Sequence, residues 1–301
     1  MKRWFIVGLW LALVAPLSAQ IVVTNVAVAD AFVSSLYPTN NYGGAGALSV
    51  SGPIATNAIG QQGGLLYTFM RFDVTSAVSN FNSAFGVGKW VVISAVLDLT
   101  EQGDPNNTIF NQGVGPFEVQ WIPDNSWVEG TGNPNNPTTD GIVWNDESSI
   151  LTNTDESLGT FVNGGTDGVV NLTLGMPSGF VSAISTGGLV SFYMTAPTNS
   201  PVGFTFHSHN FVEPSEWPLL MITAVPMPQI TSLVVTGVNV KLTFITGAGI
   251  TNVVAYRNDL VAGSWNTLTN IPGTGGSAIA VDPGAAALPK RFYRVGLTLL
   301  P

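Results

Sequence analysis

Two histidines are the first residues of this sequence whose types and spacing could do chemistry. His207 and His209 stand two residues apart, and Glu213 and Glu216 follow them. Imidazole and carboxylate groups together can bind zinc or copper. A His-x-His pair also occurs where a strand ends in an exposed loop and each ring simply packs or forms a hydrogen bond. We favour this second interpretation because the sequence identifies no further ligand group, so the metal stays unknown.

Carboxylates offer two other kinds of chemistry. A glycosidase needs two opposed carboxyl groups, but a sequence does not reveal their separation in space. The candidates are Glu101, Glu118, Glu129, Asp146, Glu147, Glu213 and Glu216. Oxygen-rich loops could instead hold a structural calcium ion, which takes about 6–8 oxygen ligands. The places for it are residues 103–107 and Asp140 with Asp146 and Glu147, although no EF-hand spacing is present.

Nucleophilic catalysis has little support in this composition. The chain has no cysteine, which excludes a thiol nucleophile, a disulfide scaffold and thiolate metal sites. It also lacks the Gly-x-Ser-x-Gly pattern of a serine hydrolase. We therefore expect no enzyme activity. A polysaccharide hydrolase or lyase stays an alternative, which a buried pair of carboxyl groups with raised pKa values would favour.

Three tryptophans are candidates for binding a ligand. Trp127 and Trp144 flank a long loop at residues 130–141, and Trp217 precedes a predicted strand. Sugars stack on exposed aromatic rings, which are rigid and lose little entropy on binding. Large aromatic side chains are more often buried, so each ring could instead belong to the core.

The first twenty residues do not look like part of the fold. Residues 1–19 have a basic start, an apolar run and a small-residue exit, which is the pattern of a secretory signal peptide. The apolar run is about half the length that a membrane span needs. No later segment reaches 18 consecutive apolar residues. We therefore expect a secreted protein without a membrane span, located outside the cell or at its surface.

Charge divides the remaining chain into two domains. Residues 20–225 contain two cations and 16 acids, a net charge of −14, whereas residues 226–301 contain five cations and two acids, a net charge of +3. Pro226 and Pro228 mark a short stiff spacer at the change. The acidic balance argues against nucleic acid as a partner, because phosphate binding needs clustered lysine and arginine.

Short runs of β-branched and aromatic residues between Gly, Pro, Asn and Asp clusters predict strands in both domains. The expected strands are 22–28, 65–72, 90–100, 117–122, 168–174, 189–195, 203–207, 219–223, 230–236, 239–246, 252–258, 265–271, 277–281 and 291–297. One short helix is expected at 178–185. This pattern predicts an all-β protein, a β-jelly-roll sandwich followed by a small immunoglobulin- or fibronectin-like β-sandwich. We expect Trp265, Phe244, Tyr256 and Phe292 in the smaller core.

A series of motifs runs through the larger domain in order: residues 30–35, 38–43 and 48–50, then 69–74, 92–99, 124–130 with 142–146, and 206–209 with 218–222. Together they resemble the DNRLRE family, which is also classed as carbohydrate-binding module family 96. The resemblance implies a non-catalytic extracellular jelly roll in which Tyr42, Gly43, Arg71 and Trp127 are structural positions. The smaller domain resembles the immunoglobulin-like modules that end many secreted bacterial proteins.

One departure from the family affects the expected ligand. Some family members bind alginate, a polyanion, which calls for a groove lined with lysine and arginine. Here the larger domain has only Arg71 and Lys89. We therefore expect a secreted carbohydrate-binding or adhesion module for a neutral extracellular polysaccharide or cell-surface polymer. The alternative is a structural matrix or surface protein that associates with copies of itself, and an uncovered edge strand would favour it.

Overall fold

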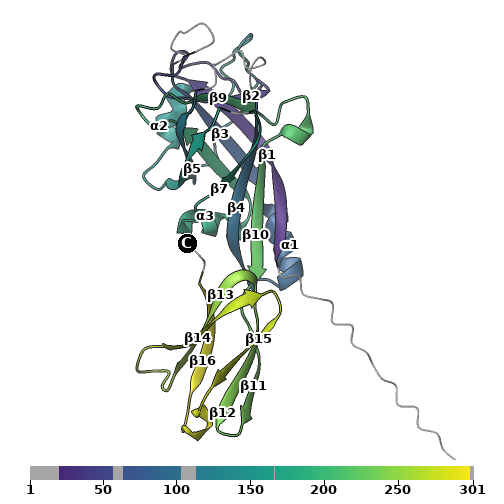
Figure 1. The fold of residues 1–301 in the computed structure, drawn as a ribbon. Coiled ribbons are helices and arrows are strands. Elements are labelled where there is room, and N and C mark those ends of the chain that lie inside the picture. Colours follow the sequence, from purple (N-terminus) through teal and green to yellow (C-terminus); the bar gives the residue numbers. More distant parts are fainter. Residues whose placement is uncertain (1–19, 57–63, 103–112, 166, 299–301) are drawn as a thin grey trace, which may run out of the picture. The chain divides into compact units, whose positions relative to one another are not determined.

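The computed structural model describes residues 20–298 except 57–63, 103–112 and 166. The chain divides into two compact units, Gln20–Pro226 and a smaller one that begins at Met227. The predicted signal peptide, residues 1–19, lies outside the described residues, as does the calcium candidate at 103–107. Each unit is a β-sandwich, so the predicted all-β fold is confirmed (Figure 1).

The larger unit contains ten strands in its described part. Its elements are β1 (Ile21–Ser34), β2 (Ala47–Ser51), β3 (Leu66–Asp73), α1 (Thr75–Phe85), β4 (Trp90–Glu101), β5 (Gly115–Ile122), η1 (Trp144–Asp146), α2 (Glu147–Ile150), β6 (Glu156–Asn163), β7 (Gly168–Thr173), α3 (Ser178–Thr186), β8 (Leu189–Thr195), β9 (Gly203–His207), η2 (Pro214–Glu216) and β10 (Leu219–Pro226). Every pairing between them is antiparallel.

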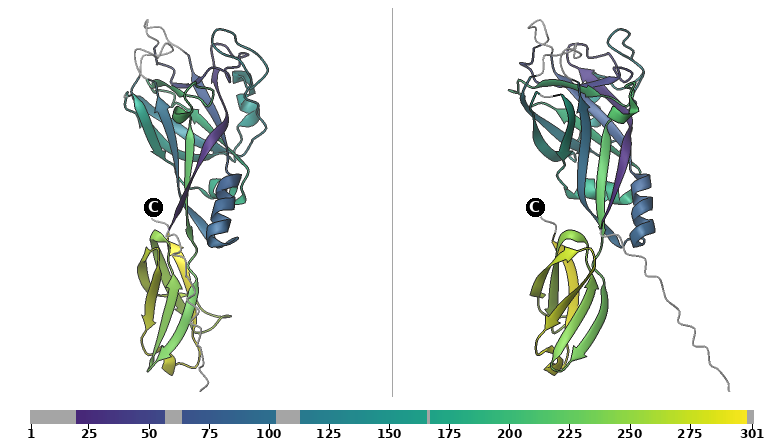
Figure 2. Two further views of the ribbon diagram at one scale, coloured as in Figure 1. Left: turned by 90° about the vertical axis from the view of Figure 1, so that its right-hand side faces the viewer. Right: turned by 45° about the vertical axis from the view of Figure 1, so that its right-hand side comes forward.

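The long strand β1 joins two layers of the larger unit. Its first half, from Ile21 to Val26, pairs with β10, and its second half, from Ala27 to Ser34, pairs with β3. The register shifts between Ala27 and Ala29, where a β-bulge bends a strand and increases its twist. The strand, purple in Figure 2, therefore pairs with β10 along its first half and with β3 along its second half within one ten-stranded sheet.

Strands β3 and β8 carry apolar side chains on both of their faces. On β3, Met70 and Phe72 point into the main core, while Phe69 belongs to a separate cluster on the opposite face. This alternation follows from the two-residue period of a strand. The connection between β5 and β6, residues 123–155, supplies the partners of Phe69 on that outer face. We call this segment the β5–β6 connection.

The sequence predicts one of the two longer helices. The expected helix at 178–185 is confirmed as α3, and the carboxylate of Glu156 accepts hydrogen bonds from the N–H groups of Gly179 and Phe180 at its start. Helix α1 was not predicted, because its serines, asparagines and valine have weak helix propensity. Its buried residues Ala77 and Phe81 are four positions apart and therefore share one face, which packs on the core.

The smaller unit is made of two three-stranded sheets. Its elements are β11 (Ile230–Thr236), β12 (Asn239–Ile245), β13 (Ala248–Arg257), β14 (Asn266–Thr274), β15 (Ser277–Asp282), η3 (Ala285–Ala287) and β16 (Phe292–Thr298). The strand orders are β11-β12-β15 and β14-β13-β16. Leu242, Phe244 and Val254 form the centre of the core between the sheets.

Trp265 does not belong to this core, so the prediction that it does is wrong. Its ring is half-exposed, and the guanidinium carbons of Arg257 and Arg294 lie 5.3 Å and 4.6 Å from its centroid. Cations are attracted to the face of an aromatic ring, so the tryptophan orders two arginines at the surface. Of the four expected core aromatics, Phe244 alone is fully buried; Tyr256 and Phe292 are also half-exposed.

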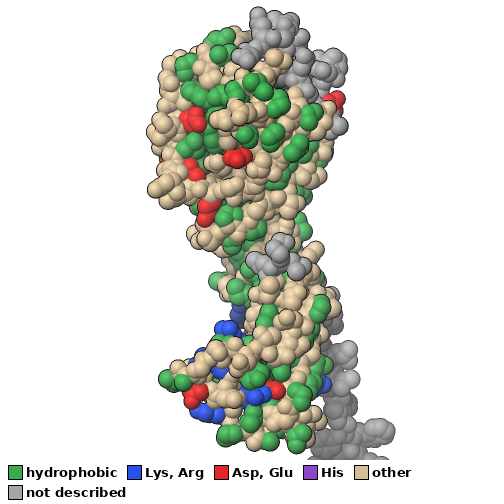
Figure 3. Space-filling view, turned by 60° about the vertical axis from the view of Figure 1, so that its left-hand side comes forward, with side chains coloured by type: hydrophobic (Ala, Val, Ile, Leu, Met, Phe, Trp, Pro, Cys, Tyr) green, Lys and Arg blue, Asp and Glu red, His purple; other side chains and the backbone are tan. Residues whose placement is uncertain are grey.

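The charge difference between the units remains visible at the surface. On the face drawn in Figure 3, lysine and arginine side chains gather on the smaller unit, and acidic side chains are spread over the larger unit. Within the described part of the chain, no helix has the length and apolar character needed to cross a membrane.

Candidate functional site

The β5–β6 connection carries most of the candidate site, and Arg71 on β3 fixes its first part. The guanidinium Nη1 donates hydrogen bonds of 2.8 Å to the carbonyl oxygens of both Asn125 and Trp127. Its central carbon also lies 4.5 Å from the centroid of the Trp127 ring. One side chain therefore satisfies two carbonyls of an irregular segment and stacks on its aromatic residue.

Trp127 is buried beneath the connection. Its side chain is 4% exposed, packs on Phe69, and donates a hydrogen bond of 3.0 Å from Nε1 to Ser191 Oγ. A ring with so little exposed surface cannot offer a face to a sugar. The structure therefore places Trp127 among the core residues and not on a stacking surface, in line with its role in the resemblance.

Asn41 fixes the second part of the connection. Its side-chain nitrogen donates to the carbonyl oxygens of Glu129 and Ile142, and its side-chain oxygen accepts from the N–H groups of Gly43 and Gly132. The side chain is fully buried, and all four partners are backbone atoms. Asn41 thus takes the place of a neighbouring strand for this stretch of loop.

Gly43 allows the connection to come this close. A Cβ atom at position 43 would lie 2.2 Å from the carbonyl oxygen of Glu129, well inside van der Waals contact. The Asn-Tyr-Gly motif of the sequence therefore has a structural cause, since Asn41 binds the connection and Gly43 makes room for it.

Trp144, the other tryptophan of the connection, is partly buried against the outer cluster. Its ring packs on Tyr67 with centroids 5.0 Å apart, and Tyr67 in turn meets the edge of Tyr193 at 5.6 Å. The hydroxyl of Tyr193 donates to the carboxylate of Glu147 in α2. Two tyrosines and a carboxylate therefore hold Trp144 in place behind its outer surface.

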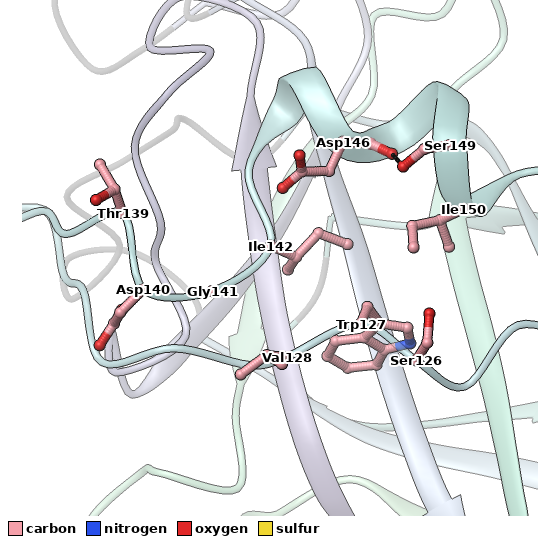
Figure 4. Close-up of a pocket in the computed structure, with 10 residues that line it drawn as sticks. All are labelled: Ser126, Trp127, Val128, Thr139, Asp140, Gly141, Ile142, Asp146, Ser149 and Ile150. Atoms are coloured by element: carbon pink, nitrogen blue, oxygen red, sulfur yellow. Dashed lines mark hydrogen bonds between the residues drawn. The ribbon is translucent and has the colours of Figure 1, made fainter.

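Two open pockets lie beside α2, on the same connection. One has a volume of about 400 Å³ and is lined by Trp144, Asn145, Glu147, Ser148 and Leu151. The other, of about 320 Å³, is lined by Ser126, Trp127, Val128, Thr139, Asp140, Gly141, Ile142, Asp146, Ser149 and Ile150 (Figure 4). Both linings mix apolar side chains with hydroxyl, amide and carboxylate groups.

A second aromatic residue belongs to the surroundings of Trp144. Tyr37 is 58% exposed, and the carbonyl of the next residue, Pro38, accepts the N–H of Asn145 at 3.1 Å. Residue type alone does not mark Tyr37 as a binding residue in the sequence. The signal that could have found it is its place in the Tyr-Pro-Thr-Asn-Asn-Tyr-Gly turn, one residue before the motif used above.

Trp217 lies apart from this surface, in the loop before β10. Its ring is half-buried, its Nε1 donates to the carbonyl of Phe211 at 2.8 Å, and its plane meets the His209 ring edge-on with centroids 6.1 Å apart. The three predicted tryptophans thus have three different environments, and the structure does not unite them in one site.

His209 belongs to a buried group of ionisable side chains from three distant segments. Asp30 comes from β1, Glu129 from the β5–β6 connection and His209 from the loop after β9. Nδ1 of His209 lies 3.3 Å from Asp30 Oδ2 and 3.3 Å from Glu129 Oε1. We call these three residues the Asp30 cluster. The sequence analysis counted Glu129 and His209 among its candidates but missed Asp30, because nothing in a strand sequence marks a buried carboxylate as functional.

Burial shifts the pKa values in and around this cluster. It raises the pKa of Asp30 and that of Glu129, the latter to about 7. Burial alone would lower the pKa of His209, but the close carboxylates of Asp30, and then of Glu129, raise it overall. Separately, burial and the charge of Asp167 raise the pKa of Glu101 to about 7.

His207 has different partners, so the two histidines do not form a joint site. Nδ1 of His207 lies 2.7 Å from Glu216 Oε2, and its ring stacks on Phe211 with centroids 3.6 Å apart. Burial lowers the pKa of His207, against the attraction of Glu216. This agrees with the interpretation favoured from the sequence, in which each ring forms its own contacts, and does not support one ion bound by both rings.

The second calcium candidate uses its oxygens locally. Asp140 accepts hydrogen bonds from Thr131 and Thr138, and Asp146 accepts one from the N–H of Val143. Among the side chains that the structure describes, the group of His, Asp and Glu residues that converges closely enough to hold a metal is the Asp30 cluster.

Comparison with known proteins adds no family. No protein-family model matches this chain, and no curated protein matches it either. The resemblance to DNRLRE domains therefore rests on the sequence motifs alone, and the functional argument rests on the geometry of these side chains.

Replacing Arg71 should release the β5–β6 connection. We expect Arg71→Leu to lower the free energy of unfolding of the larger unit by about 3 kcal/mol, because two carbonyls lose a charged donor. Arg71→Lys should recover only part of this loss, since an ammonium group lacks the planar fork. Urea unfolding of the full chain measures the change. Lys89→Leu, at an exposed position in the same unit, is the control, and an equal loss there would contradict the interpretation.

The Asp30 cluster should make stability depend on pH. A raised carboxyl pKa means that the folded state holds a proton which the unfolded state has lost, and the raised pKa of His209 acts in the same direction. The free energy of unfolding should therefore fall as the pH rises from about 4.5 to about 7. Glu129→Gln should make this fall smaller, while Glu101 keeps part of it.

Unfolding curves at several pH values measure this slope. Glu118→Gln, a half-exposed position on β5, is the matched control and should leave the slope unchanged. A free energy of unfolding that rises across this range in the parent protein would contradict the prediction.

Proposed function

We propose that this protein is a secreted, non-catalytic carbohydrate-binding or adhesion module that binds a neutral polysaccharide on the surface around Trp144. The observation that carries the proposal is the partly buried Trp144 ring, held from behind by Tyr67 and bordered by an open pocket of about 400 Å³. The motifs that resemble DNRLRE domains and the signal-peptide pattern at residues 1–19 support an extracellular place of action.

The rigidity of this surface supports sugar binding. An aromatic ring that is already fixed loses little entropy when it stacks on the CH-rich face of a sugar. Asn145, Ser148 and Glu147 stand beside the ring and offer amide, hydroxyl and carboxylate groups to sugar hydroxyls. The exposed Tyr37 provides a further aromatic surface on the neighbouring segment.

The charges of the larger unit favour a neutral ligand. Arg71 is engaged by two carbonyls and by the Trp127 ring, and Lys89 is the other cation in residues 20–226. Neither residue lines the pockets beside α2. An anionic glycan would therefore meet a surface without a free cation to attract it.

The buried carboxyl pair with raised pKa values does not favour a hydrolase. A glycosidase needs both carboxyl groups within reach of the glycosidic bond. Asp30 has no exposed surface, and its partner Glu129 contacts His209 and Asn210. Asp30 therefore lies beneath the surface, and of the two carboxyl groups only that of Glu129, whose side chain is 21% exposed, could reach a sugar.

Affinity electrophoresis of the full chain in gels that contain neutral polysaccharides, with alginate as the anionic comparison, tests the proposal. We expect retardation by a neutral polysaccharide, and Trp144→Ala should weaken it at least tenfold, since a stacked aromatic side chain contributes about 1.5 kcal/mol or more. Tyr37→Ala should weaken it less.

The matched control is Trp265→Ala, which removes a half-exposed tryptophan from the other unit and should leave binding unchanged. A parent protein that no neutral polysaccharide retards, or a Trp144→Ala variant that binds as tightly as the parent, would sink the proposal.

A second candidate function, assembly with copies of the same chain, has one observation in its favour. On the edge strand β11, Leu233 and Val235 pair with Leu242 and Val240, whose side chains are buried in the core. Leu233 and Val235 therefore face the inside of the sandwich, yet they are 52% and 60% exposed. An edge strand with an uncovered apolar face is a template for pairing with another chain.

Light scattering after size-exclusion chromatography tests this candidate. We expect the full chain to form dimers or larger assemblies as its concentration rises, and Val235→Lys should shift the protein to the monomer because a charge then lies on the apolar face. Val261→Lys, at a loop position of the same unit that is 97% exposed, is the control. A parent protein that stays monomeric at every concentration would exclude assembly through β11.

A further inference from the structure

The Asp30 cluster has the composition of a metal site. One ligand atom from each of Asp30, Glu129 and His209 lies within 4.8 Å of the other two. Two carboxylates and one neutral imidazole carry a net charge of −2, which a divalent cation would balance. Imidazole nitrogen with carboxylate oxygen is a donor set for zinc and related transition metals, whereas calcium and magnesium prefer oxygen ligands alone.

The two distances from the His209 ring nitrogen fit a tetrahedral ion. Ligand atoms bound at the zinc–nitrogen and zinc–oxygen lengths of about 2.0–2.2 Å stand about 3.3–3.6 Å apart around such an ion. Nδ1 of His209 lies 3.3 Å from Asp30 Oδ2 and 3.3 Å from Glu129 Oε1. A charge-assisted hydrogen bond between an imidazolium and a carboxylate would be shorter, at about 2.7–2.9 Å.

Two buried atoms of the cluster have unused bonding capacity. Asp30 has no exposed surface, and its Oδ1 has no hydrogen-bond partner among the described residues. Nδ1 of His209 likewise makes no aligned hydrogen bond, although two carboxylates flank it. Unpartnered polar atoms in the interior are costly, and a cation bound between the Asp30 carboxylate and the His209 ring would give both a partner.

Neighbouring groups already orient the three side chains. The backbone N–H of His209 donates a 2.7 Å hydrogen bond to Asp30 Oδ2. Asn210 donates from Nδ2 to Glu129 Oε1 at 2.6 Å and to the carbonyl of Gly43 at 3.0 Å. Such contacts fix ligand geometry in metal centres. The side chains of Glu129 and His209 are 21% and 18% exposed, which gives an ion a route from solvent.

We propose that Asp30, Glu129 and His209 bind a zinc-class divalent ion, with a fourth position open toward solvent. The ion connects β1, the β5–β6 connection and the loop after β9 through one centre. Its role is to fasten the connection, which carries Trp144, to the rest of the unit. This proposal is independent of the glycan proposal, because the side chains that bind the ion are not among the residues proposed to bind the sugar.

Calorimetric titration of the untagged, chelator-treated full chain with zinc chloride tests the site. We expect one equivalent to bind and the melting temperature of the larger unit to rise, since an ion bound only by the folded state stabilises it. Cobalt chloride in place of zinc should give the intense visible absorption of a tetrahedral site, and calcium chloride should not compete.

Variants assign the ligands. His209→Gln should weaken zinc binding more than 100-fold, and Glu129→Gln should do the same while keeping a side-chain oxygen for Asn210. His207→Gln, which removes the other imidazole near a carboxylate, is the matched control and should change the affinity less than threefold. If His209→Gln does not fold, the zinc affinity of Glu129→Gln and the cobalt spectrum of the parent protein decide whether the Asp30 cluster binds the ion. No stoichiometric binding by the parent, equal loss in His207→Gln, or equal competition by calcium would overturn the proposal.

Discussion

The larger unit depends on how one guanidinium satisfies an irregular segment. The β5–β6 connection covers the apolar outer face of β3 and β8, so part of its backbone is buried without a neighbouring strand to supply hydrogen bonds. Arg71 supplies two of these bonds and stacks on Trp127, and Asn41 supplies three more. These hydrogen bonds from Arg71 and Asn41 help to set the positions of Glu129 and Trp144.

This use of Arg71 has an electrostatic consequence for the Asp30 cluster. The larger unit has two cations and 16 acids, and its one partly buried cation is committed to carbonyl oxygens. Asp30 and Glu129 therefore share a single counter-charge, that of His209, and burial raises the pKa values of both carboxyl groups. A protein with so few basic residues can balance buried carboxylates in two ways, by protonation or by a bound cation.

The sequence predicts the strands well and the site only in part. Period-two patterns and turn residues identify most strands, but β2 and β6 were missed as separate strands because they are short or weakly apolar. The sequence does not distinguish the buried Trp127 from the partly buried Trp144, because residue type alone does not reveal which side of an irregular segment a tryptophan occupies. The spacing of the His-x-His pair likewise does not reveal which carboxylate each ring contacts. His207 contacts Glu216, whereas His209, beyond the end of β9, contacts Asp30.

The two proposals for the larger unit meet in the same connection. Glu129 lies in its first part and Trp144 in its second, with the segment bound by Asn41 between them. A binding surface on a loop gains affinity when the loop is ordered before the ligand arrives, because less conformational entropy is then lost on binding. Arg71, Asn41 and a metal ion at Asp30 would each contribute to that order from beneath the surface. The chemistry that recognises the ligand and the chemistry that holds the surface rigid can therefore lie on one segment and use different residues.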